Sequence, residues 1–246
     1  RRQPKALFQL MFSITSSLLK DFATRQGLGA IGFTSVPHTH SRQRDLHPHL
    51  HVIVPNGGYD MAKKQWRKGK KGFLFNKKAL AKVWRARVFE GIKKHPDLSL
   101  SHLKKMPEKW VVDCTKVGHG LPALKYLSRY LYRGVLPDKD ITYYDQDKVI
   151  FRYTDSTTKQ ITHRTLPPLK FLMLILQHVL PKGLQRVRDY GLLSSSAKQL
   201  RWVIQLLLLP VRDWLTPAKE TKTIRATRPC PCCQHDMQCI GITRKP

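Results

Sequence analysis

Residues 45–58 decide the fold, and they read Asp45-Leu46-His47-Pro48-His49-Leu50-His51-Val52-Ile53-Val54-Pro55-Asn56-Gly57-Gly58. In an extended segment successive side chains point to opposite faces, so His47, His49 and His51 share one face. The apolar side chains of Leu50, Val52 and Val54 share the other face. The proline, asparagine and glycines that follow are typical of a turn. The stretch therefore predicts a strand with one apolar face and one face of aligned imidazoles.

The flanking sequence predicts an α+β fold. An amphipathic helix is expected over residues 4–26, then a strand over 30–36 and a polar loop over 37–46, so that two antiparallel strands follow one helix. Further patterns predict a basic helix in the second half of 61–94, a strand at 110–114, a helix from 122 to about 133, a hairpin of 149–153 with 160–164, and helices at 169–180 and 197–209 around a basic segment at 182–190. We expect an antiparallel sheet with flanking helices, followed by a mostly helical, basic C-terminal region.

The charge of the chain points to a polyanionic partner. Its 246 residues include 45 Lys and Arg against 16 Asp and Glu, a formal net charge of +29, while 41% hydrophobic residues suffice for a folded core. Nucleic acid is the favoured partner, because cations that displace counterions from phosphates provide affinity without sequence readout. An anionic membrane surface is the alternative. The longest apolar runs fall short of the roughly 20 residues that a spanning helix needs, so no transmembrane segment is expected.

Three parts are expected along the chain: a catalytic domain over 1–165, a helical basic region over 166–216 and a basic, cysteine-containing tail over 217–246. The chain enters an expected helix directly at Arg1, which suggests that N-terminal residues are missing. Four of the five cysteines fall between Cys230 and Cys239, which favours thiol or metal chemistry in a reducing, cytoplasmic setting over a secreted disulfide framework. A possible zinc site comprises Cys230, Cys233, His235 and Cys239, which resemble half a zinc knuckle.

The aligned histidines are candidate metal ligands. Imidazole is a common ligand of divalent metals, and two imidazoles on one face of a strand can hold one ion if a third ligand comes from elsewhere. The alternative is a polar strand face that meets solvent or DNA phosphate.

A second candidate site lies on the helix expected from residue 122. Tyr126 and Tyr130 are four residues apart, so their phenols lie on one face. Beside that face, Lys125, Arg129 and Arg133 form a cationic stripe. Phosphoryl transfer needs a positioned nucleophile and positive charge near the phosphate oxygens, and this helix offers both. The alternative is a pair of amphipathic tyrosines at the edge of a core.

Together these motifs resemble the two-tyrosine rolling-circle transposases of bacterial insertion sequences, which belong to the HUH (histidine-hydrophobic-histidine) nuclease superfamily and are related to helitrons. The resemblance covers most of the chain. It rests on His47 to Gly58, on Tyr126-Leu127-Ser128-Arg129-Tyr130, on Gln177-His178-Val179-Leu180-Pro181-Lys182-Gly183 and on Arg186-Val187-Arg188-Asp189-Tyr190-Gly191.

The resemblance implies a metal-dependent tyrosine DNA endonuclease and strand transferase. His49 and His51 would hold Mg²⁺ or Mn²⁺, with Gln43 as the third ligand and with His38, His40 and His47 as the alternatives to Gln43. Tyr126 and Tyr130 would attack single-stranded DNA at the element ends and form a 5′-phosphotyrosine. Lys125, Arg129 and Arg133 would contact DNA, the two arginines at its phosphates.

Two other classes of protein remain open at this stage. A replication initiator or relaxase of the same superfamily would share the chemistry but differ in its partner. A non-catalytic basic nucleic-acid-binding protein would carry the histidines and tyrosines incidentally.

Overall fold

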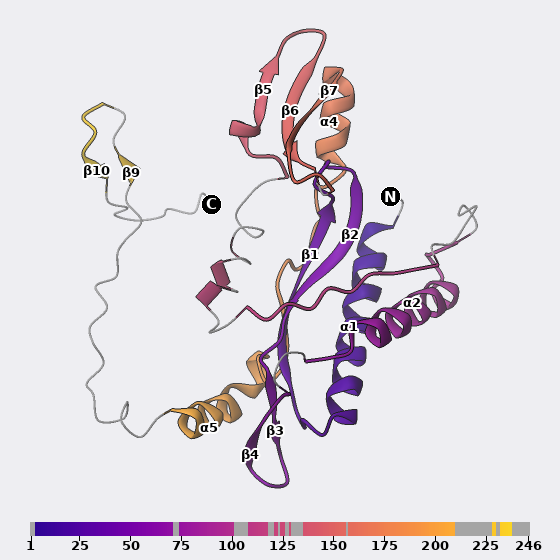
Figure 1. Ribbon diagram of the computed structural model, residues 1–246, viewed down its shortest axis with the longest axis vertical. Coiled ribbons are helices and arrows are strands. Elements are labelled where there is room, and N and C mark those ends of the chain that lie inside the picture. The colour runs from indigo at the N-terminus through magenta and orange to yellow at the C-terminus, as the bar shows by residue number, and fades with distance from the viewer. Residues whose placement is uncertain are drawn as a thin grey trace. The chain divides into compact units, whose positions relative to one another are not determined.

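The computed structural model describes residues 3–70, 74–100, 108–117, 121–122, 124–125, 128, 135–155, 157–209, 228–229 and 232–237. Contacts within the chain define two units, Arg1–Leu208 and Leu209–Pro246. The elements of the first unit are α1 (Pro4–Arg25), β1 (Gly32–His40), β2 (Leu46–Ile53), β3 (Gly57–Asp60), β4 (Gln65–Lys68), α2 (Lys77–Lys94), η1 (Asp138–Asp140), β5 (Ile141–Tyr144), β6 (Val149–Thr154), β7 (Ile161–Leu166), α4 (Pro168–Leu176), β8 (Arg188–Gly191), η2 (Ser195–Ala197) and α5 (Lys198–Leu208) (Figure 1).

The histidine strand β2 lies in a three-stranded antiparallel sheet of order β2-β1-β8. The register pairs His38 of β1 with His49 of β2, and Val36 with His51. Because paired residues project to the same side of a sheet, the histidines of both strands share one face. The other face carries Phe33 and Leu50.

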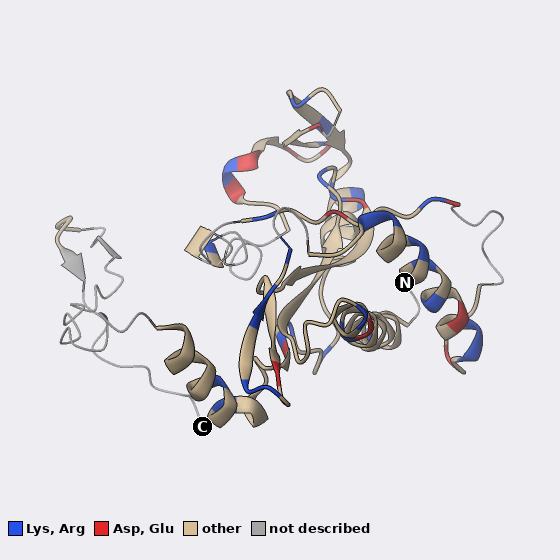
Figure 2. Ribbon diagram, turned by 60° about the horizontal axis from the view of Figure 1, so that its bottom comes forward, with Lys and Arg blue, Asp and Glu red and all other residues tan. Residues whose placement is uncertain are grey.

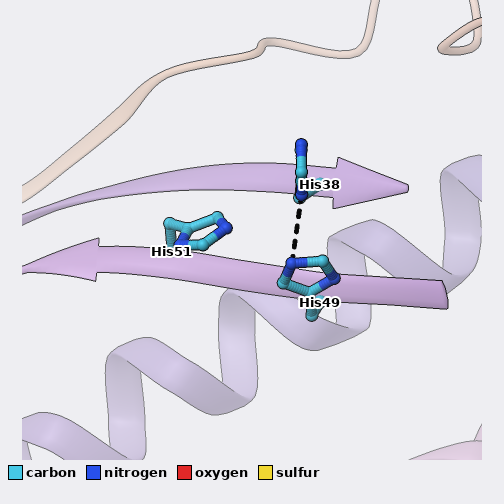
Figure 3. A group of neighbouring side chains, drawn as sticks. All are labelled: His38, His49 and His51. Carbon is cyan, nitrogen blue, oxygen red and sulfur yellow. Dashed lines mark hydrogen bonds between the residues drawn. The ribbon is translucent and has the colours of Figure 1, made fainter. Parts of the chain in front are cut away.

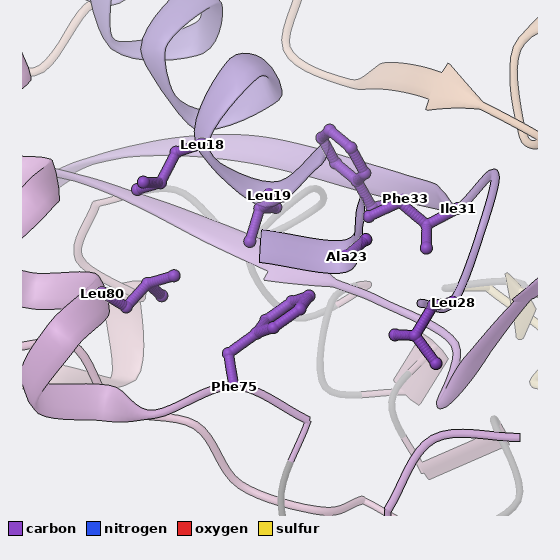
Figure 4. Close-up of a cluster of buried hydrophobic side chains, with 8 residues drawn as sticks. All are labelled: Leu18, Leu19, Ala23, Leu28, Ile31, Phe33, Phe75 and Leu80. Carbon is purple, nitrogen blue, oxygen red and sulfur yellow. The ribbon is translucent and has the colours of Figure 1, made fainter. Parts of the chain in front are cut away.

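Helix α1 covers that apolar face, as its spacing predicts. Leu18, Leu19 and Ala23 of α1 pack with Phe33 of β1 in a buried cluster (Figure 4). Leu28, Ile31, Phe75 and Leu80 complete the cluster. The helix ends where the glycines predict, since Gly27 and Gly29 both have positive φ, 68° and 77°, a region that glycine enters without steric cost. The imidazole face is left clear of α1.

The remaining elements of the first unit pack around this core. Helix α2 lies against α1, where Arg87 pairs with Asp21, and Lys and Arg recur along its length (Figure 2). The hairpin β3–β4 packs on α5 through Tyr59 and Ile204. A second three-stranded antiparallel sheet, of order β5-β6-β7, packs on α4.

The second unit is described only as a short antiparallel pair, β9 (Arg228–Pro229) with β10 (Asp236–Met237). Among the described residues of the whole chain, no helix is both long and apolar enough to cross a membrane.

The α+β class with antiparallel sheets and flanking helices is confirmed, but the structure differs from the sequence-based expectations at three places. Half of the expected loop at 37–46 is strand: β1 runs through Pro37 to His40, and β2 begins at Leu46. Pro37 is tolerated there because β8 pairs with β1 only as far as Ser35. No strand on that side of β1 needs the backbone N–H that proline lacks. Residues 110–114 form no strand.

The third difference concerns the basic segment at 182–190, whose end is strand β8. Tyr190 of β8 stacks on Phe33 with 4.9 Å between ring centroids, and Arg188 lies over the ring of Phe12. This strand therefore joins the histidine sheet, although it lies far along the chain from β1 and β2. The expected division of the chain at residue 165 stays a prediction.

We expect Phe33→Ala to lower the free energy of unfolding by about 3–5 kcal/mol, because Phe33 is fully buried between α1 and Tyr190 and its loss leaves a cavity. Chemical denaturation monitored by circular dichroism measures the change. Tyr144→Ala is the control: Tyr144 is 78% exposed, and its removal should change the free energy by less than about 0.5 kcal/mol. Equal effects of the two substitutions would contradict this placement of the core.

Candidate metal centre

Three histidines converge on the face of the β2-β1-β8 sheet that α1 does not cover. One ligand nitrogen from each of His38, His49 and His51 can be chosen so that all lie within 4.8 Å of one another. Figure 3 shows His38 on β1 and the other two on β2, with their rings gathered on one side of the strands. Ring centroids are 4.8 Å apart for His38 and His49, and 4.9 Å for His49 and His51. Within the described part of the chain this is the one group of His, Cys, Asp or Glu that could hold a metal ion.

The hydrogen bonds of His49 orient its ring for a ligand. Its Nδ1 lies 2.7 Å from the backbone oxygen of His47. A carbonyl oxygen only accepts, so Nδ1 carries the proton, and in the neutral ring Nε2 has a free lone pair. That Nε2 lies 3.1 Å from Nδ1 of His38. The lone pair of His49 therefore faces the centre of the group, where a cation would replace the bond from His38.

Burial keeps these imidazoles uncharged. Burial, reinforced by the neighbouring His40, His49 and His51, lowers the pKa of His38 to about 3. Burial and then His49 lower the pKa of His51 to about 4, and burial also lowers the pKa of His49. Only a neutral imidazole can donate a lone pair to a metal. The group is thus ready to bind a cation at neutral pH without first losing protons.

Two further histidines extend the group beyond the sheet. The ring of His40 lies 4.2 Å from that of His38 and 5.3 Å from that of His178. His178, just after α4, is 4% exposed, and its Nε2 donates a hydrogen bond of 2.6 Å to the backbone oxygen of Arg44. His178 thereby ties the segment after α4 to the loop between β1 and β2. The sequence offered His40 as an alternative to Gln43 for the third ligand but gave His178 no role; the only signal for His178 was that it lies in one of the motifs shared with the family.

The other expected ligands lie at the edge of this group. His47 is exposed, and its contribution to His49 is a backbone oxygen. Gln43 lies in the turn between β1 and β2 with an exposed side chain, and its backbone oxygen accepts a hydrogen bond from Arg164. His38, one of the alternatives to Gln43, is the residue that the strand register brings to the histidine pair.

The tyrosine helix is described only in part. Residues 121, 122, 124, 125 and 128 are helical. Lys125 is exposed, and Ser128 donates a hydrogen bond to the backbone oxygen of Lys125. Tyr126, Tyr130, Arg129 and Arg133 lie outside the described residues, so their roles stay predictions.

The cysteine-rich tail is likewise described in part. Cys233 and His235 are exposed in the turn between β9 and β10, where Nδ1 of His235 lies 3.1 Å from the backbone oxygen of Cys233. Cys230 and Cys239 lie outside the described residues. The zinc site stays a prediction.

A histidine pair separated by one apolar residue, on an antiparallel sheet with a third histidine from the next strand, fits the nuclease superfamily that the sequence resembles. In the comparison with known families, residues 32–200 match the family described as "Putative transposase". The chain belongs to this transposase family.

Two curated relatives show how much of such a protein the chain spans. It is 30% identical over 276 residues to "Putative transposase y4qJ" of Sinorhizobium fredii, an alignment that covers 98% of this chain and 68% of the relative. It is 26% identical over 211 residues to "Transposase for insertion sequence element IS801" of Pseudomonas savastanoi pv. phaseolicola, with coverage of 77% and 49%. The chain thus spans about half to two thirds of the length of these relatives. No solved structure matches it.

We expect the metal-free protein to lose stability as the pH falls from about 7 toward 4. The pKa values of His38, His40 and His51 are about 3, 4 and 4 in the folded chain, against 6.5 for a histidine exposed to water. Between these values the unfolded chain binds protons that the folded chain does not, so the stability is complete above about pH 6.5 and is lost below it.

Urea denaturation at several pH values, with metal removed by a chelator, measures this dependence. His38→Gln should flatten it, because one of the groups that bind protons only on unfolding is gone. His163→Gln, which removes an exposed imidazole on β7, should leave it as in the unaltered protein. A His38→Gln protein with an unchanged dependence would show that this histidine is not shielded.

A Mn²⁺ titration separates the candidate third ligands. His38→Ala and His49→Ala should each weaken Mn²⁺ binding by about tenfold or more, because each removes one of three nitrogens around the ion. The electron paramagnetic resonance signal of free Mn²⁺ reports the bound fraction. Gln43→Ala should leave the affinity within about twofold. The reverse pattern, with Gln43→Ala weakened and His38→Ala unaffected, would assign the third ligand to Gln43.

Proposed function

We propose that the chain nicks and rejoins single-stranded DNA at the ends of an insertion sequence, through a 5′-phosphotyrosine intermediate in rolling-circle transposition. The observation that carries this proposal is the convergence of His38, His49 and His51 on one face of the sheet. It is supported by membership of the transposase family and by the net charge of +29.

The histidines would hold a divalent cation at the scissile phosphate. Their chemistry fits this role, since three neutral imidazoles converge and the ring of His49 is fixed by a backbone oxygen. Mg²⁺ or Mn²⁺ bound there would polarise the phosphate and stabilise the charge that its oxygens gain. The chain itself supplies orientation: β1 and β2 hold three rings in place before any ligand arrives, so little rearrangement is needed on binding.

The proposed covalent step uses Tyr126 or Tyr130. The phenolic oxygen, having lost its proton to water, attacks phosphorus, and the bond from phosphorus to the 3′ oxygen breaks. The 3′ oxygen takes up a proton, so the products are a 5′-phosphotyrosine and a free 3′-OH. Attack of a 3′-OH on the phosphotyrosine reverses the exchange and releases the phenol. One phosphodiester is exchanged for another at each step, so no nucleotide cofactor is consumed.

Binding to DNA along the protein surface would come from cations that have no carboxylate partner. Lys78, Lys82 and Lys93 are exposed on α2, and none of them takes part in the ion pairs formed by the described residues. Lys77 and Lys94, in contrast, pair with Asp113 and Glu90. Unpaired lysines are free to displace counterions from phosphates, which gives salt-sensitive binding without sequence readout.

A replication initiator or relaxase would share this chemistry, but the two curated relatives are named transposases, which favours transposition. A non-catalytic DNA-binding protein is opposed by the three converging, uncharged imidazoles, because they give a binding protein no positive charge to place against phosphate.

Incubation with Mn²⁺ and end-labelled single-stranded oligonucleotides that span candidate element ends tests the proposal. We expect a covalent protein–DNA adduct, seen on denaturing gels, that retains the DNA on the 3′ side of the nick and needs the metal. The adduct should be lost in the Tyr126→Phe, Tyr130→Phe double variant and reduced by at least about a hundredfold in His49→Ala.

Tyr143→Phe, Tyr144→Phe is the matched control, because these two tyrosines are exposed on β5, away from the histidine strands in sequence. It should form the adduct normally. Salt-sensitive DNA binding without an adduct, under conditions in which Mn²⁺ binding is verified, would refute the nuclease and favour a binding protein.

A further inference from the structure

A small open cavity lies beside the histidine sheet, at the loop between β1 and β2. Its volume is about 310 Å³, and it is lined by Arg42 and Arg44 of this loop and by Thr154 at the end of β6. Two guanidinium groups and a hydroxyl are the donors that proteins use to bind phosphate. The cavity was not among the sites suggested by the sequence.

Arg44 has an unusual backbone. Its φ is 70°, in the left-handed region that residues other than glycine, asparagine and aspartate seldom adopt. Two hydrogen bonds close the loop around it, from the Arg44 N–H to Ser41 and from the Ser41 N–H to Asp45. Such outliers cost stability and cluster at ligand sites, where the surrounding structure maintains them. Lys64 and Lys159 also have positive φ between paired strands, so this conformation reflects the closed turn, and it is the side chain of Arg44 that points to a ligand.

The guanidinium group of Arg44 is half-buried without a matched anion. Its Nε is shielded from solvent and has no hydrogen-bond partner among the described residues. Asp140 is near enough to act on it electrostatically, but the carboxylate of Asp140 is bound by Arg152 at 3.0 Å. Asp45 is likewise bound by Arg164, at 2.9 Å. The nearby carboxylates are therefore engaged by other arginines, which leaves Arg44 available for an external anion.

Contacts connect this cavity with the metal centre. The backbone oxygen of Arg44 accepts the hydrogen bond from His178, the ring of His178 lies 5.3 Å from that of His40, and His40 lies 4.2 Å from His38. Arg44 and the metal histidines also belong to one hairpin. A DNA strand whose scissile phosphate lay at His38, His49 and His51 would pass close to the cavity.

We propose that Arg42, Arg44 and Thr154 form a binding site for a second phosphate of the single-stranded DNA, next to the scissile one. This inference rests on the proposed function for the direction of the strand. The site fixes the register of the DNA: two anchored phosphates, one at the histidines and one at the arginines, limit which phosphodiester reaches the tyrosines. The same donors could accept a free phosphate ion, and the experiment below distinguishes the two sources.

The test is binding of a labelled single-stranded oligonucleotide in the absence of metal. Fluorescence anisotropy measures the affinity over a range of salt concentrations. Arg44→Asn removes the guanidinium group but tolerates positive φ, so the fold should remain at least as stable, which thermal unfolding checks. We expect a loss of affinity of about tenfold. The slope of log affinity against log salt concentration should become shallower by about 0.7, the value for one phosphate of a single strand.

Lys20→Gln is the matched control, because it removes one exposed positive charge from α1; its affinity should stay within about twofold. Arg42→Gln should resemble Arg44→Asn, which keeps the test valid if one variant folds poorly. Equal small effects of all three substitutions would refute the site.

Oligonucleotides with a single methylphosphonate locate the contact, since each lacks the charge of one phosphate. With the unaltered protein, one position should weaken binding by about tenfold, and in Arg44→Asn the same position should have no further effect. An effect that persists in the variant would overturn the assignment. Displacement of DNA by inorganic phosphate well below the concentration at which chloride of equal ionic strength acts would overturn it in favour of a free-ion site.

Because these measurements need neither metal nor cleavage, they are independent of the covalent adduct. A failed adduct with a mapped phosphate contact would refute the nuclease and leave the site. A normal adduct without an Arg44 effect would refute the site alone.

Discussion

The antiparallel register between β1 and β2 is the constraint on which the rest of the site depends. Pairing of His38 with His49 and of Val36 with His51 brings a histidine of one strand to the pair on the other. A slip of one residue would turn His38 toward α1 and the apolar residues toward the solvent, which the buried core of Phe33, Leu18 and Leu19 prevents. The hydrophobic core thereby fixes the geometry of a polar site on the opposite face of the same sheet.

Burial of the histidine face has an electrostatic consequence. Imidazoles that are partly shielded from water and stand next to one another bind protons poorly, so the group remains neutral where free histidine would begin to charge. The cost in stability at low pH comes with a group of neutral nitrogens whose lone pairs could hold a cation. The backbone oxygen of His47 adds direction by selecting the tautomer of His49. Charge state and orientation are thus set by the fold before any ligand binds.

The C-terminal part of the first unit supports the histidine sheet and its β1–β2 loop, although it lies far from them in sequence. Strand β8 extends the histidine sheet on the far side of β1, and His178 holds the β1–β2 loop through the backbone oxygen of Arg44. These contacts cross more than 130 positions of sequence, as the bond from His178 to Arg44 shows. The similarity to the transposase family likewise runs from residue 32 to residue 200 and takes in both β8 and His178.

The sequence by itself determined the elements with a clear period: α1, the histidine strand, the second half of the basic stretch as α2, and the hairpin of β6 with β7. It also determined the family, because the histidine, tyrosine and C-terminal motifs occur in one order, and it predicted His49 and His51 as metal ligands. Only the tertiary structure shows that His38 lies beside them. Pro37 and the polar residues after it have the local character of a loop, and only pairing with β2 makes them a strand that carries His38 to His49. The short β8 and the cavity at Arg44 were invisible for the same reason: each exists through contacts between segments far apart in the chain, which local propensity does not encode.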